Sequence, residues 1–497
     1  MSESIPDGWI LGCISDIADV NPSGSTVVAA DDELVTFLPM AAVEELSGKI
    51  DLSTERRFGE VKKNFTRFRD NDVLFAKITP SMENGKIAVA RELRSGRGCG
   101  TTEFHVIRPA ADVAPDYLRL FLVQSRYRQT AKRNMQGAVG QQRVPADFVR
   151  GSAIPVAPAN EQRRIVSKID ELFSRIDEGE QALQRVTKLV KHHRQSVLKA
   201  AVTGELTRDW REARERAGEP VESGEALFAR ILKARRVAWE QAELAKLKAK
   251  GKAPTDDHWK RKYQEPAPPD TTDLPVLPEG WVWATLECVS ECLDYARVPV
   301  SATERASRVG DIPYFGANGQ VGTIDDYLFD EPLVLVVEDE TFTGRTKPFS
   351  YKIEGKAWVN NHAHVLRPTC AVDVDFLNVL LMRYPFIPLT TGTTARRKLT
   401  QKALMSAPVA IPPDMEQSQI LELTQRALGG VDQLILEVIG APKHATALRQ
   451  SILKAAFSGQ LVPQDPHDEP ASKLLERIAA GRANVVNTQR QRKKTTA

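Results

Sequence analysis

Hydrophobic residues recur at heptad spacing in two segments of the chain. Alternating steps of four and three residues from Ile165 to Ala200 meet apolar residues at nine of eleven positions. The same steps from Ile420 to Ala455 meet them at ten of eleven. Because the positions between are rich in Arg, Lys, Glu and Gln, the pattern predicts two helices of equal length that pair through an apolar seam.

Glycine and proline indicate where these helices end or bend. Gly204 and Gly459 follow the two heptad segments, where the left-handed conformation of a helix C-terminus favours glycine. Pro442 falls inside the second segment and predicts a local kink or break, because proline lacks the backbone N–H that a helix interior uses. Chain order favours antiparallel pairing, since the first helix leads away from the preceding segment and the second returns.

The chain also repeats its own sequence, and the repeat defines its organisation. Residues 194–206, "RQSVLKAAVTGEL", return as "RQSILKAAFSGQL" at 449–461 with nine of thirteen residues identical. Three earlier matches are "IPDGW" at 5–9 with "LPEGW" at 277–281, "HVIRP" at 105–109 with "HVLRP" at 364–368, and "IPVAPANEQRRI" at 154–165 with "VAIPPDMEQSQI" at 409–420. Each half therefore reads as a variable globular domain followed by a helix of fixed length.

These matches predict six segments. The two globular domains span 1–158 and 277–413, and the two helical regions span 159–206 and 414–461. A charged helical connector with a Pro-rich linker occupies 207–276, and a C-terminal segment with a basic tail occupies 462–497. "ALFARI" at 226–231 echoes "KLLERI" at 473–478, so the repeat extends past each long helix. The terminal "RQRKKTTA" is expected to be a disordered tail, with weak attraction to phosphate as its functional alternative.

Composition narrows the class of protein. The 497 residues are 42% hydrophobic and 27% charged, no apolar run approaches the ~20 residues of a membrane span, and the start has no signal-peptide core. Five cysteines without a CxxC pair predict a reduced, cytoplasmic protein without structural zinc. The net charge of +3 leaves nucleic-acid binding to local basic patches.

The motifs together resemble the specificity subunit of type I restriction-modification systems. The resemblance covers nearly the whole chain. It rests on "FAKITPSMENGKIAV" and "TTEFHVIRP" in the first half, on "IPYFGANGQVG" and "WVNNHAHVLRP" in the second, and on the repeated "EQ…RQS[VI]LKAA" helices. It implies an α/β (α+β) fold in which two target-recognition domains are joined by two long helices that form an antiparallel coiled coil, with a pseudo-two-fold internal repeat.

The resemblance also implies a function and partners. Each domain would read one half of an asymmetric bipartite site on double-stranded DNA, and the paired helices would set the spacing between the halves. The chain would dock methyltransferase subunits, two of them by expectation, and restriction subunits that translocate DNA. It would bind no cofactor itself, because S-adenosylmethionine, ATP and Mg would be used by the other subunits. A coiled-coil scaffold without DNA readout is the alternative.

Polar and basic loops are the candidate DNA contacts, because short polar side chains and cations reach base edges and phosphates. A Pro/Gly/Asn loop after the apolar "DVLFA" segment carries one set, and the "GQQR" segment carries another. In the second domain "TTGTTARRK" takes the place of "GQQR", and further loops carry the rest. The candidates are Lys77, Thr79, Ser81, Asn84, Lys86, Gln141, Gln142, Arg143, Asn318, Gln320, Thr343, Arg345, Lys347, Asn360, Asn361, Arg396, Arg397 and Lys398.

Other residues point away from catalysis. His105 and His364 recur in strand-like segments and are expected to pack rather than to bind metal. The chain has no GxxxxGK[ST] phosphate loop and no Asn/Asp-Pro-Pro-Tyr/Phe tetrapeptide of amino-methyltransferases. We therefore expect a DNA-recognition subunit that neither hydrolyses ATP nor methylates by itself.

Overall fold

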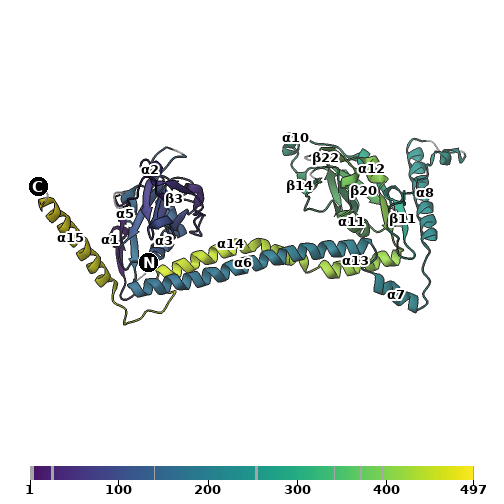
Figure 1. Ribbon diagram of the computed structural model, residues 1–497. Coiled ribbons are helices and arrows are strands. Elements are labelled where there is room, and N and C mark those ends of the chain that lie inside the picture. The colour runs from purple at the N-terminus through teal and green to yellow at the C-terminus, as the bar shows by residue number, and fades with distance from the viewer. Residues whose placement is uncertain are drawn as a thin grey trace. The chain divides into compact units, whose positions relative to one another are not determined.

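The computed structural model describes residues 5–23, 27–138, 140–251, 254, 256–340, 342–369, 372–393 and 396–495. They form two compact units (Figure 1). Unit 1 combines Met1–Gln184 with Ile439–Ala497, and unit 2 is Arg185–Val438. Each contains a mixed α/β domain and parts of the long helices, which confirms the predicted fold class.

The described residues of unit 1 form two four-stranded sheets and one two-stranded sheet. The first sheet has the order β2-β9-β6-β7, the second has the order β4-β3-β8-β5 with β3 and β8 parallel, and β1 pairs with β10. The strands are β1 (Ile10–Cys13), β2 (Ala18–Val20), β3 (Leu34–Leu38), β4 (Glu55–Arg57), β5 (Thr66–Arg69), β6 (Val73–Ala76), β7 (Ile87–Val89), β8 (Arg97–Gly100), β9 (Phe104–Pro109) and β10 (Ala153–Val156). The short helices are α1 (Ile14–Ile17), α2 (Phe58–Val61), α3 (Pro115–Val123), α4 (Ser125–Arg133) and α5 (Ala146–Gly151).

Unit 2 repeats this topology. Its sheets have the orders β12-β20-β16-β18 and β14-β13-β19-β15, with β13 and β19 parallel, and β11 pairs with β23. The strands are β11 (Val282–Thr285), β12 (Ser290–Cys292), β13 (Ile312–Gly316), β14 (Gly319–Ile324), β15 (Phe329–Asp330), β16 (Leu333–Val337), β18 (Ser350–Ile353), β19 (Lys356–Val359), β20 (Ala363–Pro368) and β23 (Pro408–Ile411). The short helices are α7 (Arg208–Arg216), α9 (Leu286–Val289), α10 (Ala302–Ser307), α11 (Val374–Met382) and α12 (Gln401–Met405).

One further sheet distinguishes unit 2 in the described part of the chain. The strands β17 (Asp339–Glu340), β22 (Arg396–Leu399) and β21 (Thr390–Thr393) form a three-stranded sheet in the order β17-β22-β21. The corresponding part of unit 1 has only isolated bridges, from Arg143 to Ile78 and to Gln136. The "GQQR" and "TTGTTARRK" segments therefore reach the same place by different backbone structures.

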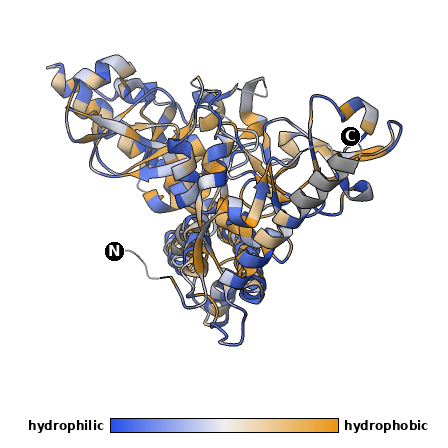
Figure 2. Ribbon diagram, turned by 90° about the vertical axis from the view of Figure 1, so that its left-hand side faces the viewer, coloured by the Kyte–Doolittle hydropathy of each residue, from blue (hydrophilic) through white to orange (hydrophobic). Residues whose placement is uncertain are grey.

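Apolar strands and helix faces build one main core in each unit. The central strands "VLFA" of β6 and "LVLVV" of β16 are fully buried, as expected for strands covered on both faces. Along the helices the hydropathy alternates instead, in keeping with one buried face (Figure 2). In unit 1 the core joins the predicted seam residues Ile165 and Ile169 to Ile452, whereas the seam positions Leu183 and Leu448 are exposed.

The first long helix is continuous, and the second is not. Helix α6 runs Ala159–Val202, whereas the second segment divides into α13 (Asp414–Leu428) and α14 (Val431–Phe457). The prediction of two equal helices was therefore wrong, and of the kink or break predicted at Pro442 the break does not occur. Helix α14 passes through Pro442, and the break falls at Gly429–Gly430, because two consecutive glycines are poor helix formers.

The helices run antiparallel within each unit, as predicted. In unit 1, Arg449 of α14 pairs with Asp177 and Glu180 of α6, whereas Asp468, further along the chain, pairs with Arg164 nearer the start of α6. In unit 2 the core joins Ile420, early in α13, to Leu198 and Ala201, late in α6.

The same two residues fasten each long helix to its domain. In unit 1 the Trp9 indole donates to Glu161 at 2.9 Å, and the Gln162 amide accepts from the Ala114 N–H and donates to the Ala157 carbonyl. In unit 2 the matching bonds are Trp281 to Glu416 at 2.9 Å, the Asp373 N–H to Gln417, and Gln417 to the Pro412 carbonyl. The repeated Glu-Gln dipeptide is therefore an anchor for the helix start.

A further helix docks on each unit, as the "ALFARI"/"KLLERI" echo suggested. Helix α8 (Gly224–Ala249) buries Leu227 and Ile231 in unit 2, and α15 (Ala471–Thr495) buries Leu474 and Ile478 in unit 1. Because α15 continues to Thr495, the prediction of a disordered tail was wrong for the backbone of 490–495, and residues 496–497 lie outside the described residues.

Candidate nucleic-acid interface

In unit 1 the fold joins the two predicted loops. The segment after β6 and the "GQQR" segment lie side by side: the Thr79 N–H donates to the Gln142 carbonyl at 3.0 Å, and the Val144 N–H donates to the Lys77 carbonyl at 2.9 Å. Two segments more than sixty residues apart in sequence thus form one polar edge of the domain.

Arg143 stands on this edge in a fixed orientation. Its guanidinium donates two hydrogen bonds to the Glu103 carboxylate, at 2.9 and 2.8 Å, and its side chain remains 42% exposed. The hydrogen bond from Arg143 lowers the pKa of Glu103, so the pair is ionic at neutral pH. The guanidinium also donates from Nη1 to the Gln141 carbonyl at 3.0 Å, and the donors that remain on this exposed side chain can reach a phosphate or a guanine.

The other unit 1 candidates divide into engaged and unengaged side chains. The Lys86 ammonium donates to the carbonyls of Met40 and Val43, at 3.2 and 3.0 Å, and therefore stabilises a loop. The Asn84 amide donates to Glu45 at 2.8 Å, and the Thr79 hydroxyl donates to Glu83. Among the candidates of unit 1, and within the described residues, the side chains without a hydrogen bond are those of Lys77, Ser81, Gln141 and Gln142.

In unit 2 the matching edge is the β21–β22 hairpin. The Leu399 N–H donates to the Glu338 carbonyl at 2.8 Å, as Val144 does to Lys77 in unit 1. Lys398 thus occupies the position of Arg143, and its ammonium lies 3.0 Å from the Glu338 carboxylate with the side chain 57% exposed. Both edges present an exposed cation held by a carboxylate.

Arg397 has a different role from the one its sequence position suggests. Its guanidinium donates to the Thr390 hydroxyl at 2.6 Å and to the Thr390 carbonyl at 3.2 Å, and so braces its own hairpin. The side chain of Arg396 lies outside the described residues. The residue equivalent to Arg143 is therefore Lys398 and not Arg397.

The remaining unit 2 candidates lie on loops beside β13 and β19. Arg345 donates to Asn318 at 2.9 Å, so the structure brings these two predicted residues together. The Gln320 side-chain amide donates to the Gly322 carbonyl, and the Asn360 side-chain oxygen Oδ1 accepts from the His362 N–H. In the described chain, the exposed candidates with no recorded side-chain bond are Thr343, Lys347 and Asn361.

The two repeated histidines lie directly beneath these edges. His105 donates from Nε2 to the Val144 carbonyl at 2.7 Å, and its Nδ1 accepts from the Asn21 amide at 2.9 Å. His364 makes the same bond to the Leu399 carbonyl at 2.9 Å. Each histidine therefore holds the segment that carries the exposed cation.

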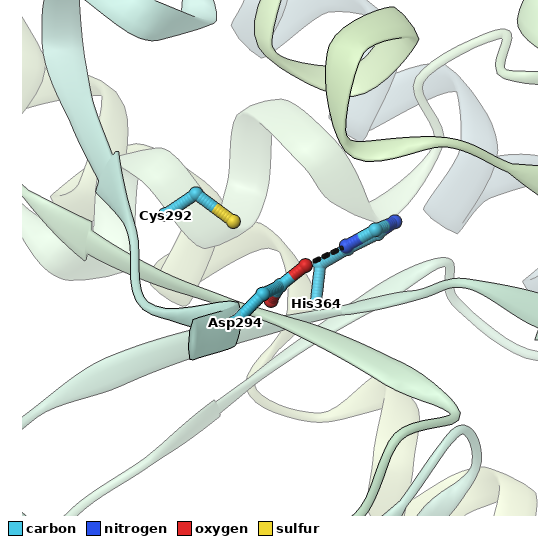
Figure 3. Close-up of side chains that lie close together, drawn as sticks. All are labelled: Cys292, Asp294 and His364. Carbon is cyan, nitrogen blue, oxygen red and sulfur yellow. Dashed lines mark hydrogen bonds and ion pairs between the residues drawn. The ribbon is translucent and has the colours of Figure 1, made fainter. Parts of the chain in front are cut away.

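The partner of the second ring nitrogen differs between the units. Where unit 1 has Asn21, unit 2 has Asp294, which lies 2.5 Å from His364 Nδ1 (Figure 3). Arg297 lies 3.1 Å from Asp294 and 2.6 Å from Glu338. Burial would raise the pKa of Asp294, but the bonds from His364 and Val365 and the Arg297 charge outweigh it and lower that pKa.

Cys292, Asp294 and His364 are close enough to suggest a metal site, with ligand atoms within 4.8 Å of one another (Figure 3). However, His364 uses both ring nitrogens in hydrogen bonds, and the Arg297 guanidinium already pairs with Asp294. Burial, with the Asp294 charge, raises the pKa of Cys292 to about 12, which keeps the thiol protonated and a poor ligand. The geometry favours a buried ion-pair network at this position.

Sequence reasoning missed the acidic residues of both edges. Glu103 and Glu338 were not candidates, although each orients the cation that was predicted or its equivalent. Glu103 lies two residues before the repeated histidine, and Glu338 follows the apolar run of β16. A search for carboxylates at the ends of the core strands could have found them.

Comparisons with known proteins agree with this architecture. The family model "Type I restriction modification DNA specificity domain" matches residues 6–188 and 278–427, which together are more than half of the chain. The chain belongs to this family. The two matched ranges coincide with the two sequence repeats, so the duplication is a duplication of the specificity domain.

Curated relatives and solved structures support the assignment. The chain is 33% identical over 314 residues, 58% of its length, to the type I restriction enzyme EcoAI specificity subunit of Escherichia coli, of which the match spans 52%. It is 25% identical over 505 residues to the EcoEI specificity subunit of Escherichia coli, covering 91% of this chain and 83% of that protein. The predicted family and the DNA-specificity class are confirmed, and these relatives do not favour a scaffold without DNA readout.

Structural similarity extends over almost the entire chain. A chain from a structure on complex assembly and conformational transition of the type I R-M system matches with a TM-score of 0.61 and 19% identity, covering 92% of this chain and all of the other. The HsdS subunit from Thermoanaerobacter tengcongensis matches with a TM-score of 0.56 and 18% identity, covering 93% and 99%. At this identity the matches establish the fold.

Proposed function

We propose that the two units of this specificity-family chain read the two unlike halves of a bipartite DNA site. The supporting observation is the pair of equivalent edges: Arg143 with Glu103 in unit 1, and Lys398 with Glu338 in unit 2. A guanidinium fork and an ammonium can both pair with guanine or phosphate, but they differ in geometry, and the loops that carry them, "GQQR" and "TTGTTARRK", differ in sequence. The half-sites should therefore differ in sequence.

We propose further that the chain is non-catalytic and works in a cytoplasmic complex. Methyltransferase subunits, two by expectation, and restriction subunits would supply S-adenosylmethionine, ATP and Mg chemistry. None of the helices in the described residues is both long and apolar enough to cross a membrane.

Methylation mapping tests the proposal. Genomic DNA from the host, with and without this gene, is sequenced by a method that detects N6-methyladenine. The expected result is that one bipartite motif with two unlike halves loses methylation when the gene is deleted. Methylation by the purified chain alone, or an unchanged methylation pattern in the deletion strain, would contradict the proposal.

The helices should set the gap between the half-sites. Inserting one heptad into α6 and one into α14 adds about 10 Å to each, since each residue adds ~1.5 Å. That corresponds to about three base pairs, although three base pairs also rotate the duplex and should reduce affinity. Methylation of a library of gap lengths measures the result. An unchanged optimum would show that the domains alone set the spacing.

A further inference from the structure

Positive charge is concentrated in a segment outside the recognition domains. Residues 230–263 contain eleven lysine and arginine residues and four aspartate and glutamate residues, a net charge of +7, although the whole chain carries only +3. The segment comprises most of α8 and a 3-10 turn at His258–Lys262. Neither the recognition edges nor the long helices account for this charge.

Only the first part of α8 is used for docking. Leu227 and Ile231 are buried, and Arg235 donates to the carbonyl of Glu287 in α9. Past Arg235 the helix has no fully buried residue, and Val237 is 46% exposed. The latter half of α8 therefore extends beyond what is needed to attach it to unit 2.

Several cations of this segment are available to a partner. Arg236, Lys246 and Lys260 are paired with neighbouring carboxylates on the same segment. In the described part of the chain, the exposed cations here without an ion pair are Lys233, Lys248, Lys250, Arg261 and Lys262. Unpaired exposed cations are the ones that can exchange counterions for phosphates.

Aromatic packing holds part of this charge in place. The Trp239 and Trp259 rings stack with centroids 6.1 Å apart and planes at 19°, and Tyr263 lies 5.4 Å from Trp239. These contacts fix the turn that carries Arg261 and Lys262 against α8. The turn and the helix thus form one basic surface.

Unit 1 repeats the arrangement at a constant offset of 247 residues. Leu474, Ile478 and Arg482 of α15 match Leu227, Ile231 and Arg235, and Arg482 donates to the Ser15 carbonyl in α1 at 2.6 Å. After the docked turns the sequence is again basic, with "QRQRKK" at 489–494. A basic extension of the docked helix in both units argues against a chance cluster in one of them.

We propose that α8 with its 258–262 turn is a phosphate-binding surface for duplex DNA, separate from base recognition. The inference rests on the proposed function. Dispersed lysines suit a sequence-independent backbone contact, because each acts as a point charge without fixed geometry. This surface would raise affinity for any duplex and leave the recognised sequence unchanged. An acidic protein surface is the alternative occupant.

The test compares two triple variants of the full chain, purified with the methyltransferase subunits that accompany it. The first is Lys248→Gln, Lys250→Gln and Arg261→Gln. The matched control is Lys63→Gln, Lys199→Gln and Lys443→Gln, which removes three exposed cations elsewhere that, within the described chain, have no recorded ion pair. Binding of a duplex with the mapped site and of a duplex without it is measured between 50 and 200 mM salt, at roughly the range where counterion release dominates.

The α8 variant should bind both duplexes more weakly, by roughly ten-fold at low salt. It should reduce the slope of log K against log salt by about 1 to 3, at ~0.9 per phosphate contact, while the methylated motif stays the same. The control should match the unaltered chain. If the α8 variant keeps the salt slope of the unaltered chain and still methylates the same motif, the inference is overturned and the proposed function stands. The same holds if its salt slope is unchanged and native mass spectrometry shows that it has lost a subunit. The proposed function would instead be overturned if host DNA showed the same methylation with and without the gene for the unaltered chain.

Discussion

The two units share a topology but differ in how they balance buried charge. Both fasten a long helix with Trp, Glu and Gln, and both hold a cation-bearing segment with a histidine. Unit 1 satisfies His105 with the neutral amide of Asn21, whereas unit 2 uses Asp294 and adds Arg297 and Glu338. The repeat therefore retains the geometry of the hydrogen bonds around the histidine, whereas the charge of the side chain that bonds its Nδ1 differs between the units.

The glutamates that fasten the long helices, Glu161 and Glu416, also differ in the charges around them. Replacing them is expected to give the largest difference between the units in the free energy of unfolding. The buried Glu416 accepts from Trp281 at 2.9 Å and from Thr207 at 2.7 Å, and it also pairs with Arg211. Glu161 accepts from Trp9, but among the described residues its second oxygen has no hydrogen-bond partner, and burial raises its pKa.

Replacing these glutamates with glutamine should therefore affect the units unequally. Glu416→Gln leaves Arg211 without its charged partner and should lower the free energy of unfolding by about 3 kcal/mol. Glu161→Gln should change it by less than about 1 kcal/mol, because the carboxylate has no cation to lose at hydrogen-bond distance. Urea unfolding followed by tryptophan fluorescence measures both, and equal losses would remove the contrast.

The recognition edges give the second effect. Arg143→Ala should impair methylation of sites through one half-site and Lys398→Ala through the other, each by about 1 to 3 kcal/mol if a base contact is lost. A library with each half randomised in turn reports the change. Lys402→Ala, an exposed cation on the neighbouring helix α12, is the control. If both edge variants alter the same half, the assignment of one edge to each half is wrong.

Asn21→Asp gives a smaller effect and converts one unit toward the other. Burial lowers the pKa of His105, so the unfolded chain binds a proton at this histidine more readily than the folded chain does. The contribution of the neutral His105 to stability is therefore complete above about pH 6.5, and it declines as the pH falls below that value. A carboxylate at Asn21 should raise that pKa and remove the decline. Thermal unfolding at pH 7.5 and 5.5, with histidine hydrogen exchange followed by mass spectrometry, measures it.

Unit 2 should respond to acid differently in the same measurement. The pKa values of Asp294 and Glu338 are lowered, because bonds from His364, Arg297 and Lys398 outweigh their burial. Their contribution to stability is complete above the ordinary carboxylate pKa of about 4 and is lost as the pH falls through the lowered values.

For unit 1, unchanged stability of Asn21→Asp at pH 5.5 would show that the Asn21 amide does not control the pKa of His105.

Periodicity and the repeat predicted much of the fold. The heptad pattern located α6 and the antiparallel pairing, because apolar spacing directly reflects the buried seam. It did not locate the break in the second helix: Pro442 is exposed within α14, whereas Gly429–Gly430 has no distinctive place in a heptad pattern. The low helix propensity of glycine decides the break at Gly429–Gly430, whereas the heptad pattern reflects only the packing of apolar side chains.

The candidate site was harder to predict because its residues meet through backbone hydrogen bonds between segments far apart in the sequence. The polar loop after β6 and "GQQR" were predicted separately, but their contact through Lys77, Thr79 and Val144 depends on the fold. The Arg143 and Lys398 equivalence likewise follows from matching hydrogen bonds, since both loops contain other cations or amides. Sequence alone gives residue types, whereas orientation by Glu103 and Glu338 requires the structure.

A domain exchange tests whether each unit reads one half-site independently of the other. The second domain, residues 277–413, is replaced with a second copy of residues 5–158, which keeps both the Trp–Glu and the Gln anchors. Methylation mapping of a host carrying this chain should show a motif with two like halves, both equal to the half that Arg143→Ala disrupts. A motif that keeps its two unlike halves would contradict the account.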